Sequence, residues 1–401
     1  MGLIVQKFGG SSVANAERIM NVANIVTGAY NKGNSMVVVV SAQGDTTDDL
    51  IEKAKEINPK ASKREMDVLL STGEQISIAL LAMAIEKLGC PVKSLTGWQA
   101  GFQTDSSHGN SRISRINKER LVNELDKGNI VIVAGFQGLN RYDDITTLGR
   151  GGSDTSAVAI AAVLGADLCQ IYTDVDGVYT TDPRMVSNAQ KLDVISFDEM
   201  LELSSLGAQV LHTRSVEMAK KYNVNLEVLS SLTKRPGTII KEVVNVEKML
   251  VKGVAKDNNV ARLSIIGVQD VPGIAFKIFS TLASKKINVD IILQSVGRHN
   301  TKDIAFTVSG DQKDEAMELL DSLSQLMNAQ EIVCDDDISK VSIVGAGMAT
   351  NPGVAARMFE ALSDAGINIQ MISTSEIKIS VLIRKEDCQR AVAAIHDAFI
   401  E

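Results

Sequence analysis

The chain has 401 residues, enough for two or three domains, and 45% of them are hydrophobic while 22% are charged. That composition is normal for a globular protein, and a net charge of -8 gives no basic surface for nucleic acid, so we expect no nucleic-acid partner. The first residues run directly into a strand pattern, and no uncharged apolar run is long enough for a membrane span. The four cysteines are scattered without disulfide or metal spacing. We therefore expect a cytoplasmic protein with reduced thiols, no signal peptide and no membrane partner.

Residues 2–13 predict a strand, a glycine turn and the start of a helix. Leu3 to Val5 is apolar, Lys7 to Ser12 holds the turn, and a helical pattern runs from Ile19 to Val26. A turn of this kind cradles phosphates on backbone N–H groups, and Lys7 would add charge for the β and γ oxygens. The lysine precedes the glycines, so this is not a Walker A motif. The alternative is a plain turn between strand and helix.

Met36 to Val40 is a β-branched run typical of a strand buried on both faces of a parallel sheet. It ends in the polar turn 41–47, the end of a strand at which α/β sheets bind ligands. A long helical stretch follows from Glu65 to Leu88. Within it Glu74 lies beside a glycine in apolar surroundings, which is unusual, and the alternative interpretation is a surface charge.

Residues 146–154 follow another predicted strand, Ile130 to Phe136, and have three glycines in four positions. Ser153 and Asp154 are good N-cap residues, and the apolar run after them has the spacing of a buried helix face. A glycine turn at a helix N-terminus attracts anions, and Arg150 adds a cation suited to a carboxylate or a phosphate. The alternative is an ordinary loop with a charged tip.

The strand predicted at 167–173 ends in a loop, Thr173 to Arg184, that combines acidic, aromatic and basic side chains. Its aspartates are also turn formers, but Tyr179 and Arg184 favour a nucleotide pocket. Strands alternate with helices up to a late strand at 226–229. This alternation predicts a three-layer α/β domain over residues 1–245.

The remainder of the chain contains an internal repeat. Asp270 to Phe279 matches Thr350 to Phe359, and in each copy a strand precedes the match while a strand pair and a helix follow it. Two copies are too few for a solenoid and fit a pair of βαββαβ modules. The shared Pro-Gly places proline near the helix start and leaves N–H groups free for a small carboxylate. The alternative is a duplicated module with only a structural role.

The second repeat has too little chain for a fourth strand, and an unpaired sheet edge is a liability. We predict that the apolar segment 249–255 crosses over to complete its sheet, so that the first module is inserted within the second. The predicted boundaries are 1–245 for the first domain, 246–260 for the linker and crossover strand, 261–336 for the first module and 337–401 for the second.

Together these segments carry a family resemblance that covers essentially the whole chain. Val5 to Val13 resembles the N-terminal signature of aspartate kinases, Gly149 to Asp154 their second signature, and Thr173 to Arg184 their nucleotide loop. The tandem repeat is similar to the family's pair of ACT domains. The resemblance implies a three-layer αβα amino acid kinase fold with a mostly parallel sheet, followed by two ACT-like, ferredoxin-like regulatory modules.

The resemblance implies transfer of the γ-phosphoryl group of MgATP to the β-carboxylate of L-aspartate. The product, 4-phospho-L-aspartate, leads to lysine, threonine, methionine and diaminopimelate. Lysine, threonine or the two together are the implied feedback effectors, and the sequence leaves the choice open. The implied assembly is a homodimer or higher homo-oligomer formed through the ACT modules. An internal start near Met249 would give a separate regulatory chain.

Roles carry over by position. The implied catalytic residues are Lys7, Arg150 and Asp154. The implied substrate residues are Ser41, Thr47, Glu74, Arg150, Gly151, Gly152 and Ser153, with Glu74 at the ammonium and Arg150 at the α-carboxylate. The implied ATP residues are Lys7, Phe8, Gly9, Gly10, Ser11, Ser153, Thr173, Asp174, Tyr179, Asp182, Pro183 and Arg184. The predicted effector residues are Asp270, Pro272, Gly273, Ile274, Ala275, Asn288, Val289, Asp290 and Gln294.

The chemistry is consistent with these roles. A carboxylate nucleophile is ionised at neutral pH and needs no strong base, so catalysis rests on alignment and charge neutralisation. Mg²⁺ is expected to arrive with ATP, without direct side-chain ligation. Gln209 stands where many members have lysine, which puts a nucleotide contact there in doubt. In the second module Thr350-Asn351 lacks the acid that Asp270 provides, so that turn is expected to be mainly structural.

Two rival functions differ in class. One is a carboxylate or carbamate kinase of the same fold, and the combined motifs speak against it. The other is an amino-acid sensor that keeps the kinase fold as a scaffold, which the presence of Lys7, Glu74, Arg150 and Asp154 disfavours. A bifunctional kinase and dehydrogenase is not expected at this length.

Overall fold

A computed structural model describes residues 2–207, 210–233, 235–242, 250–297, 300–349 and 351–400. The chain divides into two compact units, residues 1–179 with 190–245, and residues 180–189 with 246–401. The segment 180–189 therefore groups with the C-terminal unit, whereas the sequence predicted one continuous domain over 1–245. Gln209, Thr350 and the residues 243–249 lie outside the described part of the chain.

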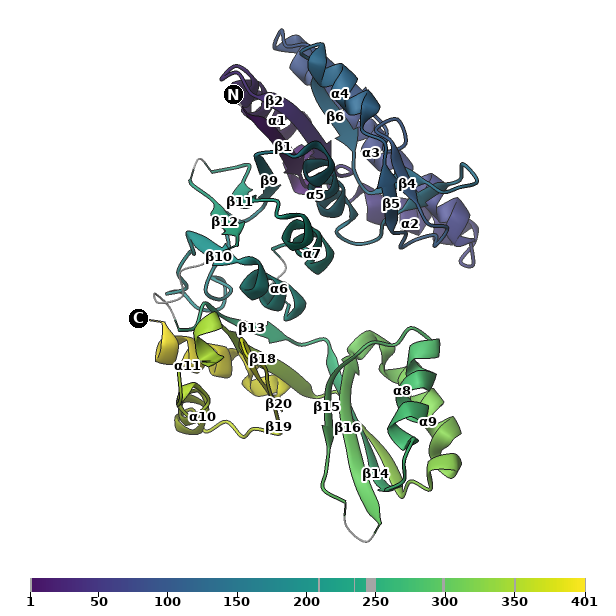
Figure 1. Ribbon diagram of the computed structural model, residues 1–401, viewed down its shortest axis with the longest axis vertical. Coiled ribbons are helices and arrows are strands. Elements are labelled where there is room, and N and C mark those ends of the chain that lie inside the picture. The colour runs from purple at the N-terminus through teal and green to yellow at the C-terminus, as the bar shows by residue number, and fades with distance from the viewer. Residues whose placement is uncertain are drawn as a thin grey trace. The chain divides into compact units, whose positions relative to one another are not determined.

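The N-terminal unit is built on an eight-stranded sheet in the order β10-β12-β11-β9-β1-β2-β6-β3 (Figure 1). Its strand pairs are parallel except for β11 with β12, which confirms the predicted mostly parallel α/β sheet. The strands are β1 Leu3–Phe8, β2 Ser35–Val40, β3 Val92–Leu95, β6 Ile130–Ala134, β9 Leu168–Thr173, β10 Val194–Ser196, β11 Leu226–Ser230 and β12 Thr238–Lys241.

A second, smaller sheet in this unit has the order β5-β4-β7-β8 and leads into the glycine turn at 148–152. Its strands are β4 Phe102–Thr104, β5 Ile113–Ile116, β7 Gln137–Leu139 and β8 Ile145–Thr147. The helices of the unit are α1 Ala16–Tyr30, α2 Thr46–Ile57, α3 Lys63–Lys87, α4 Glu119–Asp126, α5 Gly152–Leu164, α6 Phe197–Ser205 and α7 Thr213–Tyr222, with a short 3-10 turn at Gly10–Val13.

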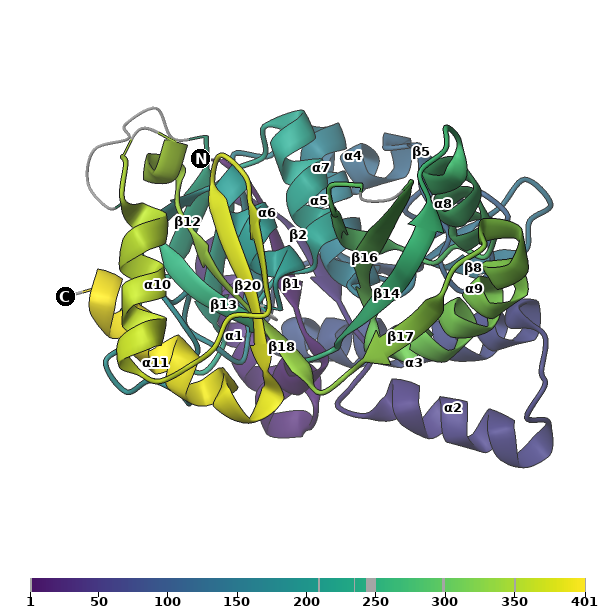
Figure 2. The ribbon, with the colours of Figure 1, turned by 90° about the horizontal axis from the view of Figure 1, so that it is seen from below.

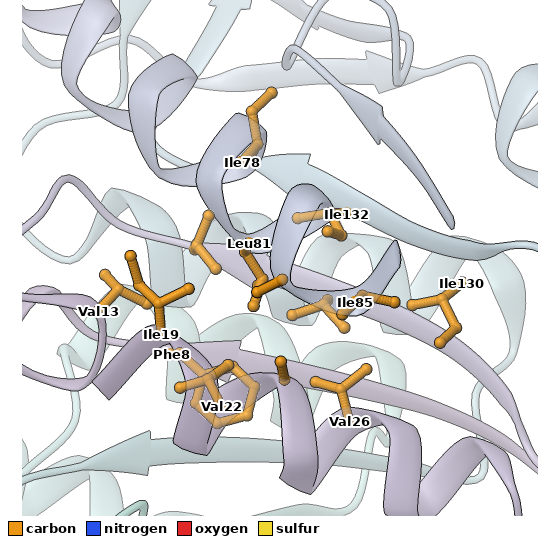
Figure 3. Packing of buried hydrophobic residues seen from close by; sticks show 14 of the residues in the cluster. Phe8, Val13, Ile19, Val22, Val26, Ile78, Leu81, Ile85, Ile130 and Ile132 are labelled. Atoms are coloured by element: carbon orange, nitrogen blue, oxygen red, sulfur yellow. The ribbon is translucent and has the colours of Figure 1, made fainter. Parts of the chain in front are cut away.

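Helices α1 and α3 pack on the main sheet through one continuous core (Figure 3). Val22 of α1, Leu81 of α3 and Val38 of β2 are all fully buried there. Because alternate strand residues point to opposite faces, the same β-branched strands also supply apolar side chains to the other face. β2 is accordingly buried from Met36 to Val40, as its continuous apolar run predicts.

By length and composition alone, α3 is a helix that could cross a membrane, which the sequence reasoning did not expect. It packs in the core of the N-terminal unit, and 44% of its most apolar stretch is buried there. The buried set includes two carboxyl groups, Asp67 and Glu74.

The C-terminal unit consists of two modules with the predicted βαββαβ pattern. The first has the strand order β15-β16-β14-β17, and helices α8 and α9 pack on one of its faces (Figure 1). The second has the order β13-β18-β20-β19, with helices α10 and α11 (Figure 2). The strands are β13 Gly253–Asp257, β14 Val260–Gln269, β15 Val289–Gln294, β16 Thr301–Ser309, β17 Glu331–Asp335, β18 Ile338–Val344, β19 Met371–Thr374 and β20 Lys378–Arg384. The helices are α8 Ile274–Ser284, α9 Lys313–Met327, α10 Val354–Asp364 and α11 Cys388–Phe399.

β13 pairs antiparallel with β18, from Gly253 opposite Val344 to Asp257 opposite Lys340. The pairing predicted for the crossover strand at 249–255 is thus confirmed, although the strand lies slightly later in the chain. The first module is inserted between β13 and the rest of the second, because β14 follows β13 after only a short turn. The chain that leaves the N-terminal unit is therefore an integral strand of the C-terminal unit.

The segment 180–189 is held by the second module at several points. Val186 is buried in that module's core beside Val254, and Val254 donates its N–H to the carbonyl of Thr180 at 2.7 Å. The Thr180 hydroxyl also lies 2.9 Å from Nε2 of His396, a fully buried side chain on α11. Burial lowers the pKa of His396, so a neutral imidazole accounts for this bond.

Candidate active site

Lys7 and Asp154 form the ion pair at the centre of the N-terminal unit. Lys7 lies near the C-terminal end of β1, and Asp154 lies in the first turn of α5. The distance from Lys7 Nζ to Asp154 Oδ1 is 2.7 Å, and the two side chains are only 12% and 13% exposed. The pair thus fixes a cation at the edge of the sheet where parallel strands leave room for a ligand.

The two turns after β1 and β2 approach each other backbone to backbone. Gly44 donates its N–H to the Gly10 carbonyl at 3.1 Å, and Ser41 donates to the Phe8 carbonyl at 3.1 Å. A Cβ on Gly10 would lie 2.7 Å from the carbonyl oxygen of Ala42, closer than any side chain tolerates. Glycine is therefore required in the first turn to bring the two strand ends together.

The turn that carries Arg150 is also shaped by glycine. Gly151 is the N-cap of α5 with a φ of 66°, and a Cβ there would lie 2.2 Å from the Cβ of His212. Beside it, Ser153 is 8% exposed and packs against Gly135, where a Cβ would lie 2.7 Å from the serine Oγ. Arg150 itself is exposed at the tip of the turn.

Glu74 is a buried carboxyl group in α3 whose side chain accepts a backbone hydrogen bond from the turn after β2. Its side chain is 3% exposed, and its Oε1 accepts the N–H of Ala42 at 3.1 Å. Its Oε2 is buried and has no hydrogen-bond partner among the described residues. Burial raises the pKa of Glu74 to about 7. Such a carboxyl group is suited to a cation that supplies the missing donor, which favours the functional interpretation over a surface charge.

Three of the predicted ATP residues, Thr173, Asp174 and Tyr179, lie at the end of β9 and in the loop after it. Thr173 donates its hydroxyl to Asp174 at 2.9 Å, and Phe8 stacks on Tyr172 with ring centroids 4.4 Å apart. Tyr179 donates to Asp176 at 2.7 Å, and this hydrogen bond holds the pKa of Asp176 below its usual range. Asp176 is thus a structural partner of Tyr179 that sequence reasoning did not single out.

Three further predicted ATP residues, Asp182, Pro183 and Arg184, belong to the segment grouped with the C-terminal unit. Arg184 donates to both oxygens of Asp182, from Nε at 3.0 Å and from a terminal nitrogen at 2.9 Å. This side-chain pairing lowers the pKa of Asp182. Their assignment to ATP stays a prediction.

The predicted effector residues of the first module divide between the two ends of β15. Asp270, the Pro272-Gly273 turn and Gln294 lie at the end where β14 and β15 finish, and Asp270 pairs with Lys302 at 2.9 Å. Asn288, Val289 and Asp290 lie at the start of β15, the opposite end. There Asp290 pairs with Lys340 of the second module at 2.5 Å. Within one chain the structure therefore does not bring the full predicted set together.

Asp67, His108 and Arg214 are polar groups near the glycine turn that sequence reasoning missed. Asp67 is 1% exposed and Arg214 is half-buried, so neither is an ordinary surface charge. The signal for Asp67 was present in the sequence, because it precedes Glu74 by seven residues and so shares its helix face. No group of three or more potential metal ligands occurs in the described ranges.

Comparison with known proteins covers both units. A family model described as the amino acid kinase family matches residues 2–230, and an ACT domain model matches residues 263–322 and 341–399. An aspartokinase from Bacillus sp. (strain MGA3) is 52% identical over 400 residues, which is 100% of this chain and 97% of the relative. The aspartokinase of Corynebacterium glutamicum is 52% identical over 405 residues, covering 100% and 96%.

Solved structures also match both units of the chain. Aspartokinase III of E. coli in complex with aspartate and ADP (R-state) superimposes with a TM-score of 0.85 at 26% identity and covers 100% of both chains. The same enzyme in complex with lysine and aspartate (T-state) gives a TM-score of 0.77, also at 26% identity and 100% of both chains. Fold, site and matches thus define an amino acid kinase that carries tandem ACT domains. The chain belongs to the aspartokinases and is an ATP-dependent aspartate kinase.

Proposed function

We propose that the chain transfers the γ-phosphoryl group of MgATP to the β-carboxylate of L-aspartate and releases 4-phospho-L-aspartate. The observation that carries this proposal is the buried, half-satisfied carboxyl group of Glu74, which is bonded to the turn after β2 where that turn meets the turn after β1. A site with a buried carboxylate and an exposed arginine recognises the two charged ends of an amino acid. The complexes of E. coli aspartokinase III with aspartate support the same substrate.

Each residue has a distinct proposed role. Glu74 accepts the substrate ammonium on Oε2, and Arg150 binds the α-carboxylate in bidentate fashion. The β-carboxylate then faces Lys7, whose charge is held in place by Asp154 and offsets the charge of the phosphoryl oxygens. Ser41, Thr47 and the 151–153 turn line the substrate, and the turn at 8–11 and the loop at 173–184 line ATP.

The residues present fit MgATP. The glycine turn lies directly beside the Lys7 ammonium, since a Cβ on Gly9 would be in ordinary contact with its Nζ at 3.6 Å. Mg²⁺ supplies further charge neutralisation when it arrives with the nucleotide. The chain's own contribution is to align two anions and to exclude water from them.

Trapping of the product tests the proposed reaction. An acyl phosphate reacts with hydroxylamine to give a hydroxamate, and we expect the β-hydroxamate of aspartate to accumulate in step with ADP. ADP without hydroxamate, or a hydroxamate on the α-carboxyl group, would contradict the proposed acceptor.

The pKa of Glu74 predicts a pH dependence of substrate binding. Since this pKa is raised to about 7, free Glu74 is protonated below that pH and ionised above it. The substrate ammonium requires the ionised form, so the KM for aspartate should fall as pH rises from 6 to 8, while the KM for ATP changes little. Glu74→Gln should flatten this profile. An unchanged profile in the glutamine variant would assign the titration to another group.

We also propose feedback by lysine, threonine or both at the ACT modules, and a pathway role that leads to lysine, threonine, methionine and diaminopimelate. The lysine complex of E. coli aspartokinase III supports lysine as one effector. The proposal also includes a homodimer or higher homo-oligomer formed through the ACT modules, a cytoplasmic location and an internally initiated regulatory chain.

Asp270 is the proposed ammonium partner of the effector. Its carboxylate is 48% exposed and already pairs with Lys302, so an incoming ammonium would share or replace that partner. Asp270→Ala and Gln294→Ala should each relieve inhibition and leave uninhibited activity intact. Titration of activity with lysine and threonine, singly and together, checks this, with Asp311→Ala on the same module as control. Unchanged inhibition curves for both variants would remove these residues from the site.

The integral position of β13 predicts mechanical coupling between effector binding and catalysis. Flexible residues inserted around 243–246 should weaken inhibition while effector still binds. Calorimetry would measure binding, and a coupled assay would measure inhibition. Full inhibition by bound effector in the lengthened chain would exclude this route.

A further inference from the structure

The carboxylate of Asp67 on α3 gathers donors from two separate segments. Its Oδ1 accepts the hydroxyl of Thr147 at 2.5 Å, and its two oxygens accept the N–H of Gly109 at 3.1 and 3.0 Å. Oδ2 also accepts Nδ1–H of His108 at 2.9 Å. Asp67 and Thr147 are each 1% exposed. Breaking these four bonds would leave a buried carboxylate unpaired, which is costly. Both segments are therefore fixed to α3.

Both segments border the turn that carries Arg150. Thr147 ends β8 and precedes that turn directly, and its carbonyl accepts the N–H of Ser111 at 2.9 Å. A Cβ on Gly149 would lie 3.0 Å from Oδ1 of Asn110, so the 108–111 loop supports the turn from behind.

Arg214 is bonded to the same two segments. It donates to the carbonyl of Leu148 at 3.0 Å and to that of Ser111 at 2.9 Å. The start of the Arg150 turn is therefore held by two charged groups, Asp67 and Arg214.

Asp67 and Glu74 lie on one face of one helix. They are seven residues apart, which is two helical turns and about 10 Å along the axis. Between them, the carbonyl of Ser71 accepts the side-chain amide of Gln137 at 2.9 Å, so this face of α3 is bonded at three points from Asp67 to Glu74. The helix thereby carries both the proposed ammonium acceptor and the anchor of the Arg150 turn.

We propose that Asp67 is a positioning residue for substrate selection. By fixing the Arg150 turn to α3, it sets the distance between Glu74 and the turn that binds the α-carboxylate, so that α3 acts as a ruler between the two. This inference rests on the proposed function, because it assumes that Glu74 and Arg150 bind the two ends of aspartate. It goes further in assigning a role to Asp67, His108, Thr147 and Arg214. Asp67 does not touch substrate and acts through the turn.

The test uses an isosteric pair at Thr147 in the full-length chain. Thr147→Val removes the hydroxyl bond to Asp67 and keeps the side-chain shape, whereas Thr147→Ser keeps the hydroxyl. We expect the valine variant to raise the KM for aspartate by about tenfold and to leave the KM for ATP within about twofold. The serine variant should restore the KM for aspartate. Asp67→Ala should give a larger effect of the same kind.

An aspartate analogue with a neutral 1-amide in place of the α-carboxylate supplies a second readout. It lacks the charge that the Arg150 turn would bind, so its inhibition constant should change little in the valine variant. Glu65→Gln, an exposed position on the same helix, serves as control. Thermal melting of each variant reports on folding.

The outcomes separate the two levels of the proposal. If the valine variant raised both KM values alike, left the KM for aspartate unchanged, or equalled the serine variant, Asp67 would be only a structural residue. If the wild-type chain did not phosphorylate aspartate, the proposed function and the ruler would fall together. If the wild type phosphorylated aspartate and the valine variant behaved normally, the ruler alone would be wrong.

Discussion

Lys7→Ala should lower kcat by a factor of about 10² or more, because fixed charge on the transferring group supplies several kcal/mol of transition-state stabilisation. The change also leaves Asp154, now 13% exposed in its ion pair, without its cation next to the incoming phosphates. Its negative charge would then oppose the reaction. Single-turnover measurement of aspartyl phosphate formation isolates this effect from substrate binding.

The fold should survive this change, since Lys7 lies at a strand end and not in the core. Lys93→Ala removes an exposed lysine from an edge strand of the same sheet and serves as the matched control. A folded Lys7→Ala variant with near-normal kcat would remove Lys7 from the phosphoryl site.

Glu74→Ala and Arg150→Ala should each raise the KM for aspartate far more than the KM for ATP. Losing one partner of a desolvated ion pair costs roughly 2–5 kcal/mol, which corresponds to about 30-fold or more in affinity. We expect the larger effect at Glu74, because its carboxyl group is 3% exposed whereas Arg150 lies at the surface.

Two exposed positions supply controls for these variants. Glu86 lies on the same helix as Glu74, and Arg141 lies in a neighbouring surface turn, so alanine at either should leave both KM values unchanged. Initial-rate measurements with each substrate varied in turn give the KM for aspartate and the KM for ATP of each variant. A rise mainly in the KM for ATP would mean that these residues line the nucleotide site and not the substrate site.

The architecture could be predicted from the sequence because its signals are local. The β-branched run at 36–40 and the apolar run at 130–134 each form a buried parallel strand, and a polar turn follows the first of them. Counting strands in the second repeat was enough to place β13, because an incomplete sheet needs a partner from elsewhere in the chain.

What could not be predicted depends on tertiary contacts. Val186 and Thr180 have no local feature that shows burial in a distant module, so the 180–189 segment was assigned to the first domain. Asp290 pairs with Lys340 of the second module, a side chain that is 6% exposed, and nothing in the sequence around Asp290 indicates this pairing. The periodicity of the sequence does not indicate a salt bridge between residues that are 50 positions apart.

The candidate site shows the same division. Glycine turns and the conspicuous Glu74 were visible in the sequence, because each breaks the local pattern in which it stands. Asp67 was missed although its seven-residue spacing from Glu74 places both on one helix face, since a lone acid near a helix start resembles a surface residue until the fold brings Thr147 and Gly109 to it.

The central claim is that Glu74 and Arg150 hold an amino acid so that a carboxylate one methylene from the α-carbon meets the phosphoryl group. Comparison of kcat/KM for L-aspartate and L-glutamate, with ATP turnover followed in a coupled assay, tests it most directly. We expect efficient turnover of aspartate and a kcat/KM for glutamate lower by about 10² or more, because the extra methylene moves the reacting carboxylate out of alignment. Equal turnover of the two amino acids, or ATP hydrolysis that needs neither, would contradict the account.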